Sequence, residues 1–212
     1  TTPETSADTP TPVGGRGSSR RPPFHRRPGG VSPPLFFGVA AVVVALDQAA
    51  KSLAIANLPI GQSKPVVGEL LQLTLTFNSG AAFSFGSGVT WLFTIALAAV
   101  AIAILIVAWR IRSRGWAITL GLLLAGVLGN LSDRLFREPG FPVGHVVDYI
   151  STPWLMPAIY NIADMFIVSS MIVVAILVLR GFNLDGTRQV SPPKSGSTVG
   201  TAASVADDGE AA

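Results

Sequence analysis

The sequence contains no cysteine and only two histidines in 212 residues. The missing cysteines exclude disulfide bonds, thiolate zinc sites and cysteine nucleophiles. His25 and His145 are too few to build a histidine-rich metal site. We therefore expect neither a metal nor a cofactor.

Charge is also scarce. Charged residues make up 13% of the chain, against about 25% in an average soluble domain. Hydrophobic residues make up 49%, and the mean hydropathy is +0.53. The charges are crowded into the two tails, so the middle of the chain has the composition of a membrane protein. The net charge of +3 comes largely from an arginine-rich N-terminal tail, which beside apolar spans indicates a membrane-flanking segment and not nucleic-acid binding.

Four apolar runs are candidate membrane spans: residues 35–58, 89–109, 116–131 and 162–179. A span needs about 20 residues to cross a hydrocarbon core of about 30 Å. The first run is too long for the apolar part of a signal peptide and carries Asp47 and Lys51, so we expect it to be retained. The third run is the shortest, and Gly121, Gly126 and Gly129 give it a small-residue face for close helix packing.

The two longer connections differ in character. In residues 66–77 apolar and polar side chains alternate in part, and several side chains are β-branched. This pattern predicts one or two short strands at the membrane surface. Residues 135–159 contain four prolines together with Tyr149 and Trp154, which predicts an interfacial loop. Residues 78–83 are expected to form a turn of small residues. The tails, residues 1–34 and 181–212, are expected to be disordered, which leaves a membrane domain over residues 35–180.

Basic residues decide how the spans are oriented. Eleven of them lie in the N-terminal tail, in the turn after the second run and after the fourth run: Arg16, Arg20, Arg21, Arg26, Arg27, Arg110, Arg112, Arg114, Arg180, Arg188 and Lys194. The two long connections hold only Lys64, Arg134 and Arg137. Because basic residues favour the cytoplasmic side, both termini are predicted to be cytoplasmic and both long connections to lie outside.

The polar residues of the membrane domain are expected to gather in one outer layer. At about 1.5 Å per residue, Asp47 lies about 18 Å and Lys51 about 24 Å along the first helix from its inner end. Seven further residues lie at the outer ends of the runs or in the outer connections: Asn78, Asn130, Asp133, Arg134, Asp148, Asn161 and Asp164. Ionisable residues within spans are functional candidates because they are costly to place there.

Three pairs in this layer have helical spacing: Asp47 with Lys51, Asn130 with Arg134, and Asn161 with Asp164. Each pair has a purely structural alternative, a salt bridge or hydrogen bond that fixes helix packing. For Asp47 and Lys51 the structural and the catalytic role both stay open. For Asn130, Asp133 and Arg134 we favour a scaffold role, in which the arginine holds carboxylates in place.

Asp148 and Asp164 have no lysine or arginine three or four positions away. Asp148 lies in the apolar segment Val146–Ile150, where desolvation raises the pKa of a carboxyl group. Two carboxylates that meet in such a setting share a proton, as in aspartic proteases, which use the pair to activate water against an amide. With no cysteine and no metal motif, this is the most economical hydrolytic chemistry. The alternative is two unrelated interfacial aspartates.

Five ordered blocks of the chain resemble the lipoprotein signal peptidase family, also called signal peptidase II. They are Asp47–Lys51, Asn78–Phe83, Gly129–Arg134, Val146–Tyr149 and Tyr160–Asp164. The resemblance implies a membrane α-helical fold with four transmembrane helices and a small extracytoplasmic β-cradle. It also implies an intramembrane aspartic endopeptidase of the bacterial cell membrane, which cleaves diacylglyceryl-modified prolipoproteins just before the lipidated cysteine.

The matching positions imply roles for individual residues. Asp148 and Asp164 would be the catalytic pair. The residues that shape or stabilise the site would be Asp47, Lys51, Asn78, Asn130, Asp133, Arg134 and Asn161. The expected partners are lipid-modified prolipoprotein substrates and membrane lipids, with no nucleic acid, and the enzyme is expected to be a monomer whose site faces outward.

Three other functions compete with this one. Prepilin-type and presenilin-type aspartic proteases carry Gly-x-Gly-Asp, which the chain lacks. A serine protease would use His145 as the base for Ser79, Ser84 or Ser132, but no Gly-x-Ser-Gly element is present. A small proton-coupled transporter or scaffold would carry polar groups through the full depth of the bilayer, whereas the inner halves of all four runs are apolar.

Overall fold

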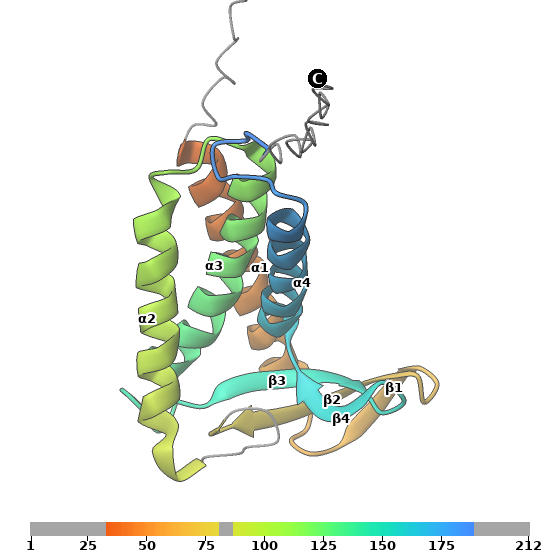
Figure 1. The fold of residues 1–212 in the computed structure, drawn as a ribbon. Coiled ribbons are helices and arrows are strands. Elements are labelled where there is room, and N and C mark those ends of the chain that lie inside the picture. Colours follow the sequence, from red (N-terminus) through yellow and green to blue (C-terminus); the bar gives the residue numbers. More distant parts are fainter. Residues whose placement is uncertain (1–32, 81–86, 189–212) are drawn as a thin grey trace, which may run out of the picture.

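The computed structural model describes residues 33–80 and 87–188. Four helices run side by side, and a small sheet lies across one end of the bundle (Figure 1). The helices are α1 (Pro33–Asn57), α2 (Thr90–Ala108, preceded by the 3-10 turn η2, Ser87–Val89), α3 (Arg114–Phe136) and α4 (Ile162–Leu179). All four are long and apolar enough to cross a membrane, so the predicted four-span fold is confirmed.

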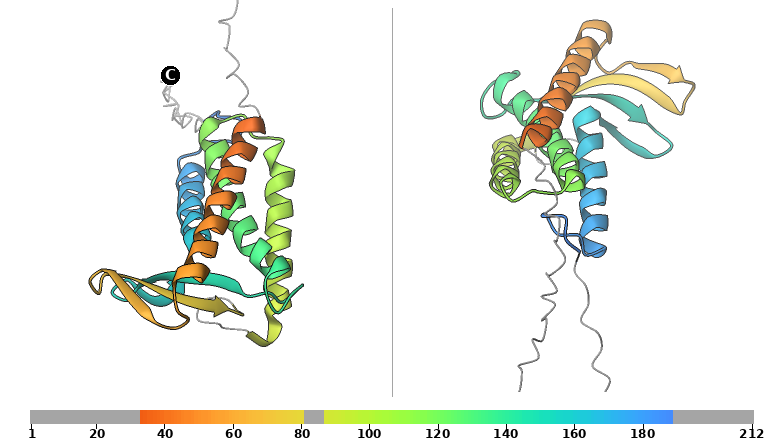
Figure 2. Two further views of the ribbon diagram at one scale, coloured as in Figure 1. Left: turned by 180° about the vertical axis from the view of Figure 1, so that it is seen from behind. Right: turned by 90° about the horizontal axis from the view of Figure 1, so that it is seen from above.

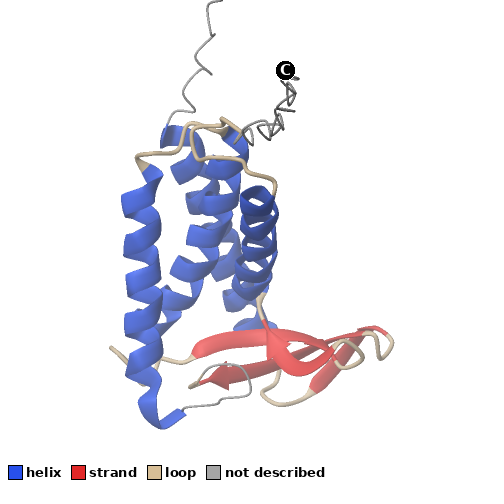
Figure 3. Cartoon of the chain, viewed as in Figure 1, coloured by secondary structure: helices blue, strands red, loops and turns tan. Residues whose placement is uncertain are grey.

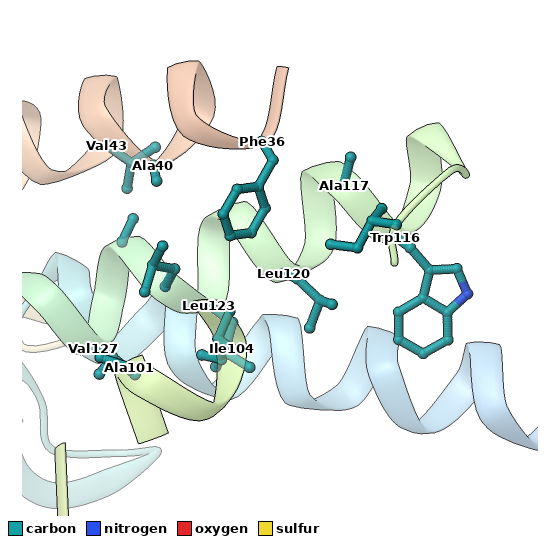
Figure 4. Packing of buried hydrophobic residues seen from close by; sticks show 13 residues of the cluster. Phe36, Ala40, Val43, Ala101, Ile104, Trp116, Ala117, Leu120, Leu123 and Val127 are labelled. Carbon is teal, nitrogen blue, oxygen red and sulfur yellow. The ribbon is translucent and has the colours of Figure 1, made fainter. Parts of the chain in front are cut away.

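Helix α3 is the centre of the bundle and packs against α1, α2 and α4 (Figure 2). Most of α3 is buried, whereas the other three helices expose most of their residues. In the core, Phe36 of α1 is directed toward α3, Ala101 of α2 lies near Val127 of α3, and Ile104 of α2 lies near Leu123 of α3 (Figure 4). The exposed apolar faces of α1, α2 and α4 suit contact with lipid.

Three glycines allow neighbouring helices to approach α3 closely. A Cβ on Gly121 would lie 2.9 Å from a peptide oxygen of α1. A Cβ on Gly126 would lie 2.5 Å from the carbonyl oxygen of Ala163 in α4, and one on Gly129 would lie 2.6 Å from Oδ2 of Asp47 in α1. The predicted small-residue positions do serve close packing, and they divide between α1 and α4.

The length of α3 corrects the prediction that the third span is the shortest. It has 23 residues, against 19 in α2 and 18 in α4. The apolar run ends at Leu131, but the helix continues through Asp133 and Arg134 to Phe136. Both polar side chains are buried and find partners on neighbouring elements. A helix surrounded by protein therefore continues past the end of its apolar run.

The sheet is antiparallel with strand order β1-β2-β3-β4 (Figure 3). The first long connection supplies β1 (Ser63–Val67) and β2 (Leu71–Asn78). The predicted strands are therefore present, but β1 begins three residues before the predicted stretch of residues 66–77. The second connection, predicted as a loop, supplies β3 (Val146–Thr152) and β4 (Met156–Tyr160). It becomes strand because β2 offers a free edge with which β3 pairs. In that register Thr76 lies opposite Asp148, and the end of β4 leads directly into α4.

The described chain continues past α4 to residue 188, beyond the predicted end of the membrane domain at residue 180. Residues 181–188 form a small hairpin with a bridge between Phe182 and Arg188. The carbonyl oxygen of Leu184 accepts the backbone N–H groups of Arg112 at 2.9 Å and Ser113 at 3.2 Å. The hairpin thus covers the turn between α2 and α3, opposite the sheet. Residues 1–32, 81–86 and 189–212 lie outside the described residues, so the expectations for them stay predictions.

Candidate active site

Two carboxylates meet where the sheet joins the helix bundle. Asp148 lies in β3 and is 2% exposed, and Asp164 lies in the first turn of α4 and is half-buried. Both line a groove of about 900 Å³ between α2, α3, α4 and the β3–β4 hairpin. Asn78, Asn130 and Arg134 line its polar end, and most of the remaining lining is apolar. The structure therefore brings together the two acids that have no basic neighbour in sequence.

Asn161, between β4 and α4, links the two carboxylates. Its Nδ2 donates to Oδ1 of Asp148 at 2.7 Å. Its backbone N–H donates to Oδ2 of Asp164 at 3.1 Å, and its Oδ1 accepts from the backbone N–H of Asp164 at 3.1 Å. The last two bonds form a capping box at the start of α4. The residue that begins the helix thus also fixes the relative position of both acids.

Two further asparagines complete the hydrogen bonding of the pair. Nδ2 of Asn78 donates to Oδ2 of Asp148 at 3.0 Å, and Nδ2 of Asn130 donates to Oδ1 of Asp164 at 2.7 Å. Oδ1 of Asn130 accepts from Nζ of Lys51 at 3.0 Å, which orients the Asn130 amide so that its NH₂ group faces Asp164. Each oxygen of both carboxylates therefore has one N–H donor.

Asp148 is poised to hold a proton near neutral pH. Burial, followed by the negative charge of Asp164, raises the pKa of Asp148 to about 7. Hydrogen bonds from Asn78 and Asn161 and the charge of Lys51 act in the opposite direction and are outweighed. The two carboxyl groups also lie close together, since both accept hydrogen bonds from Asn161.

Beneath this pair lies a buried ionic cluster. Nζ of Lys51 lies 2.9 Å from Oδ2 of Asp47 and 2.9 Å from Oδ2 of Asp133, and the Lys51 side chain is fully buried. Nε of Arg137 lies 2.7 Å from Oδ1 of Asp133. Two carboxylates thus face two cations, which avoids the large cost of an unpaired buried charge. The predicted pair of Asp47 and Lys51 does form an ion pair.

The two acids of this cluster also hold backbone groups of the site. Oδ1 of Asp47 accepts from the N–H of Ala163 in the first turn of α4 at 3.0 Å. Oδ2 of Asp133 accepts from the N–H of Val147 at 3.1 Å, one residue before Asp148. Asp47 therefore anchors the helix that carries one catalytic candidate, and Asp133 anchors the strand that carries the other.

Arg134 is buried as well, and its hydrogen bonds go to backbone carbonyl oxygens. Nη1 donates to the carbonyl oxygen of Gly144 at 3.1 Å, and Nη2 donates to that of Gly80. In the described part of the chain, the arginine paired with Asp133 is Arg137. The expectation that Arg134 holds carboxylates is therefore corrected in part. Among the described residues Arg134 forms no salt bridge, and Arg137, four residues after Asp133 on the same helix face, pairs with Asp133 instead. The charges of Asp148 and Asp133 nevertheless act on Arg134. Through its hydrogen bonds Arg134 ties the two outer connections to α3.

Eight of the nine predicted site residues are linked directly by side-chain hydrogen bonds or ion pairs, and Arg134 joins them through Gly80. Two further residues, Gln48 and Arg137, belong to this network although they are not among the predicted site residues. Nε2 of Gln48 donates to Oδ1 of Asp133 at 3.2 Å, and its Oε1 accepts from Nη2 of Arg137 at 3.3 Å. The spacing of Arg137 four residues after Asp133 was the signal for that contact, whereas the role of Gln48 depends on tertiary contacts.

The serine-protease alternative finds no support in the described residues. The hydroxyl of Ser132 donates to the carbonyl oxygen of Gly129 at 3.2 Å, and no hydrogen bond joins the side chain of His145 to a serine in residues 33–80 and 87–188. Ser84 lies outside those residues.

Comparison with known proteins points in one direction. The family model of signal peptidase (SPase) II matches residues 39–180. A lipoprotein signal peptidase from Leifsonia xyli subsp. xyli is 50% identical over 173 residues, which cover 82% of this chain and 78% of that protein. A lipoprotein signal peptidase from Rhodococcus jostii is 42% identical, and the match covers 76% of this chain and 85% of that protein.

A solved structure is similar as well. It is a bacterial membrane enzyme determined by the in meso method at 2.3 Å resolution, and it superposes with a TM-score of 0.62 at 29% sequence identity. The superposition covers 74% of this chain and 94% of that one. Family match, relatives and shared fold agree with the five sequence blocks, and the chain belongs to the signal peptidase II family.

Proposed function

We propose that this chain removes signal peptides from lipid-modified prolipoproteins, cleaving before the lipidated cysteine, and that Asp148 and Asp164 are its catalytic pair. The observation that carries this proposal is the pair itself. Two carboxylates from different elements share Asn161 as a bridge and face one largely apolar groove. Such a pair suits the hydrolysis of an amide by activated water.

The roles of the two acids follow from their surroundings. Asp148, with its pKa raised to about 7, is the partner that holds the shared proton, and Asp164 carries the charge. Asp164 takes a proton from water, while the protonated Asp148 donates a hydrogen bond to the scissile carbonyl. The water oxygen bonds to the carbonyl carbon, the C–N bond then breaks, and the leaving nitrogen takes up a proton from the pair.

The groove supplies positioning for such a substrate. Its apolar walls come from the membrane-spanning helices α2, α3 and α4, so acyl chains and an apolar signal segment can lie along them while the scissile bond lies at the polar end. The described residues 33–80 and 87–188 supply an N–H donor to each oxygen of both carboxylates. Because the hydrogen bonding of the pair needs no second subunit, we infer that a monomer is sufficient for catalysis.

We also infer that the sheet and the carboxylate pair face the outside of a bacterial cell membrane. The turn between α2 and α3 and the end of α4 carry Arg110, Arg112, Arg114, Arg180 and Arg188. All five lie at the end of the bundle opposite the sheet (Figure 1). The tendency of basic residues to remain in the cytoplasm supports this orientation.

The catalytic proposal is tested by replacing each acid with its neutral isostere. Asp148→Asn and Asp164→Asn each keep the shape of the side chain but remove the carboxyl group, so each is expected to lower cleavage of a lipidated precursor by at least about 10³-fold. Asp185→Asn is the matched control, because Asp185 is exposed at the opposite end of the bundle. Cleavage is measured in membranes with equal amounts of each variant.

Wild-type cleavage in both isosteric variants would rule out the aspartic mechanism. Loss of cleavage in His145→Ala, with full activity in both isosteric variants, would instead support a serine protease. Proton uptake without any cleavage would support the transporter alternative.

A further inference from the structure

A second cavity lies at the opposite end of the bundle from the carboxylate pair. Its volume is about 640 Å³, and it is formed by the ends of α2 and α4, the beginning of α3 and the hairpin of residues 181–188. Apolar side chains, among them Val107, Val178 and Phe182, form much of its wall, and Arg110 lines it as well. The hydrogen-bond network of the carboxylate pair does not reach this cavity, so catalysis leaves it without a role.

Positive charge lies at and near the cavity. Arg110 lines it, and Arg112, Arg180 and Arg188 are exposed at the same end of the bundle. Within residues 33–80 and 87–188 none of the four forms an ion pair, although the charge of Arg112 acts on Asp185 and the guanidinium of Arg188 lies 5.6 Å from the ring centre of Phe182. The nearby carboxylate of Asp185 also lines the cavity, and its Oδ1 already accepts from the backbone N–H and the hydroxyl of the hairpin's threonine at 2.8 and 2.7 Å. The net local charge is therefore positive, which attracts an anion.

Trp116 brings a hydrogen-bond donor without an acceptor to the cavity. It lines the cavity and is 6% exposed, and its indole lies at the edge of the apolar cluster (Figure 4). Its Nε1–H has no acceptor among the described residues. Buried indole N–H groups usually have a partner, so a bound molecule with an oxygen acceptor would supply what the protein lacks at this position.

We propose that this cavity binds an anionic phospholipid from the leaflet that surrounds this end of the bundle. Its phosphodiester would be attracted by Arg110 and the neighbouring arginines, and its glycerol and upper acyl chain would contact the apolar wall beside Trp116. Basic pockets between transmembrane helices are suited to such headgroups. Arginines that serve only to orient the protein would need neither an apolar cavity nor a tryptophan with an unfilled hydrogen bond.

The test measures lipid binding to the purified full chain. After delipidation in a neutral detergent, the dissociation constants of phosphatidylglycerol and phosphatidylcholine are determined by native mass spectrometry. We expect phosphatidylglycerol to bind more tightly, and Arg110→Gln to weaken its binding about fivefold, since one basic residue near a membrane contributes on the order of 1 kcal/mol. Lys64→Gln, at the sheet end, is the matched control and is expected to bind as the wild type does.

A second variant, Arg180→Gln, is measured in case Arg110→Gln disturbs the local fold. Cleavage of a lipidated precursor shows that each variant is folded. Equal affinity for the two lipids would overturn the proposal, as would unchanged phosphatidylglycerol binding in both folded variants. Inorganic phosphate is added as a competitor. Displacement of the lipid at millimolar phosphate would identify a site for free phosphate and overturn the lipid assignment, whereas retention of the lipid supports it.

Discussion

At the scale of single residues, Asn161 both begins a helix and links the two carboxylates of the site. It begins α4, it donates to Asp148, and it exchanges two hydrogen bonds with Asp164. An asparagine suits this position because its amide is both donor and acceptor. An aspartate here would bring a third negative charge to the two acids and would lose the donor to Asp148.

Asn161→Ala is therefore expected to lower both catalysis and stability. Loss of the side-chain cap and of the buried hydrogen bonds to Asp148 and Asn130 lowers the free energy of unfolding by about 1–3 kcal/mol, and loss of the bridge lowers cleavage by at least about 10²-fold. Thermal unfolding and the single-turnover cleavage rate measure the two effects. Asn183→Ala removes another hydrogen-bonded asparagine, in the hairpin after α4, and is expected to leave cleavage unchanged. Full activity in Asn161→Ala would show that the bridge has no role in the reaction.

At the scale of elements, the contact between α3 and α4 sets the position of Asp164. A Cβ on Gly126 would lie 2.5 Å from the carbonyl oxygen of Ala163 and 2.7 Å from Cγ1 of Ile167. There is no space for a methyl group unless α4 moves away from α3. Because Ala163 directly precedes Asp164, that movement would displace the carboxylate from Asn130.

Gly126→Ala is accordingly expected to lower the free energy of unfolding by about 1–3 kcal/mol and to reduce cleavage in parallel. Gly38→Ala is the control, because a Cβ on Gly38 meets nothing within 4 Å and alanine favours a helix. Both variants are compared by thermal unfolding in detergent and by cleavage of a lipidated precursor. A stable and fully active Gly126→Ala protein would show that the close approach of α4 is not needed.

Elements with strong local signals could be predicted from the sequence, and those that depend on a partner could not. The four spans follow from apolar runs, and the pairing of Asp47 with Lys51 follows from helical spacing. The strands β3 and β4 were not predicted, because Pro157 and the nearby aromatic residues indicate a loop. β3 pairs with β2, about 70 residues earlier in the chain, and β4 in turn pairs with β3.

Contacts of long sequence separation explain what was missed within the site. The pairing of Asp148 with Asp164 could be predicted because neither has a basic residue three or four positions away and because both match the family pattern. The partners of Arg134 are carbonyl oxygens 10 and 54 residues away, and no local pattern distinguishes them from carboxylates. Gln48 contacts Asp133, 85 residues later, through a packing arrangement that only the folded bundle defines.

At the scale of the whole molecule, the two ends of the bundle are chemically different. One end carries the sheet and the carboxylate pair, and the other carries the arginines and the second cavity (Figure 1). The proposed orientation places the first end outside the cell. Because the chain has no cysteine, a single introduced cysteine can report the side on which it lies.

Lys64→Cys in β1 is expected to react with a membrane-impermeant maleimide in intact cells, whereas Arg114→Cys at the start of α3 is expected to react only after the membrane is opened. Both positions are exposed, so a difference in labelling reports the membrane and not burial. Labelling of Arg114→Cys in intact cells, with Lys64→Cys protected, would reverse the orientation.

Catalysis in the proposed mechanism depends on one proton shared by Asp148 and Asp164. Burial and the charge of Asp164 raise the pKa of Asp148 to about 7, so the protonated form that polarises the scissile carbonyl is lost as the pH rises through that value. The most direct measurement is the single-turnover cleavage rate of a lipidated precursor between pH 5 and pH 9. We predict that the rate falls above about pH 7, approaching about tenfold per pH unit. A rate that continues to rise up to pH 9, as for a base that must first lose its proton, would contradict the shared-proton pair.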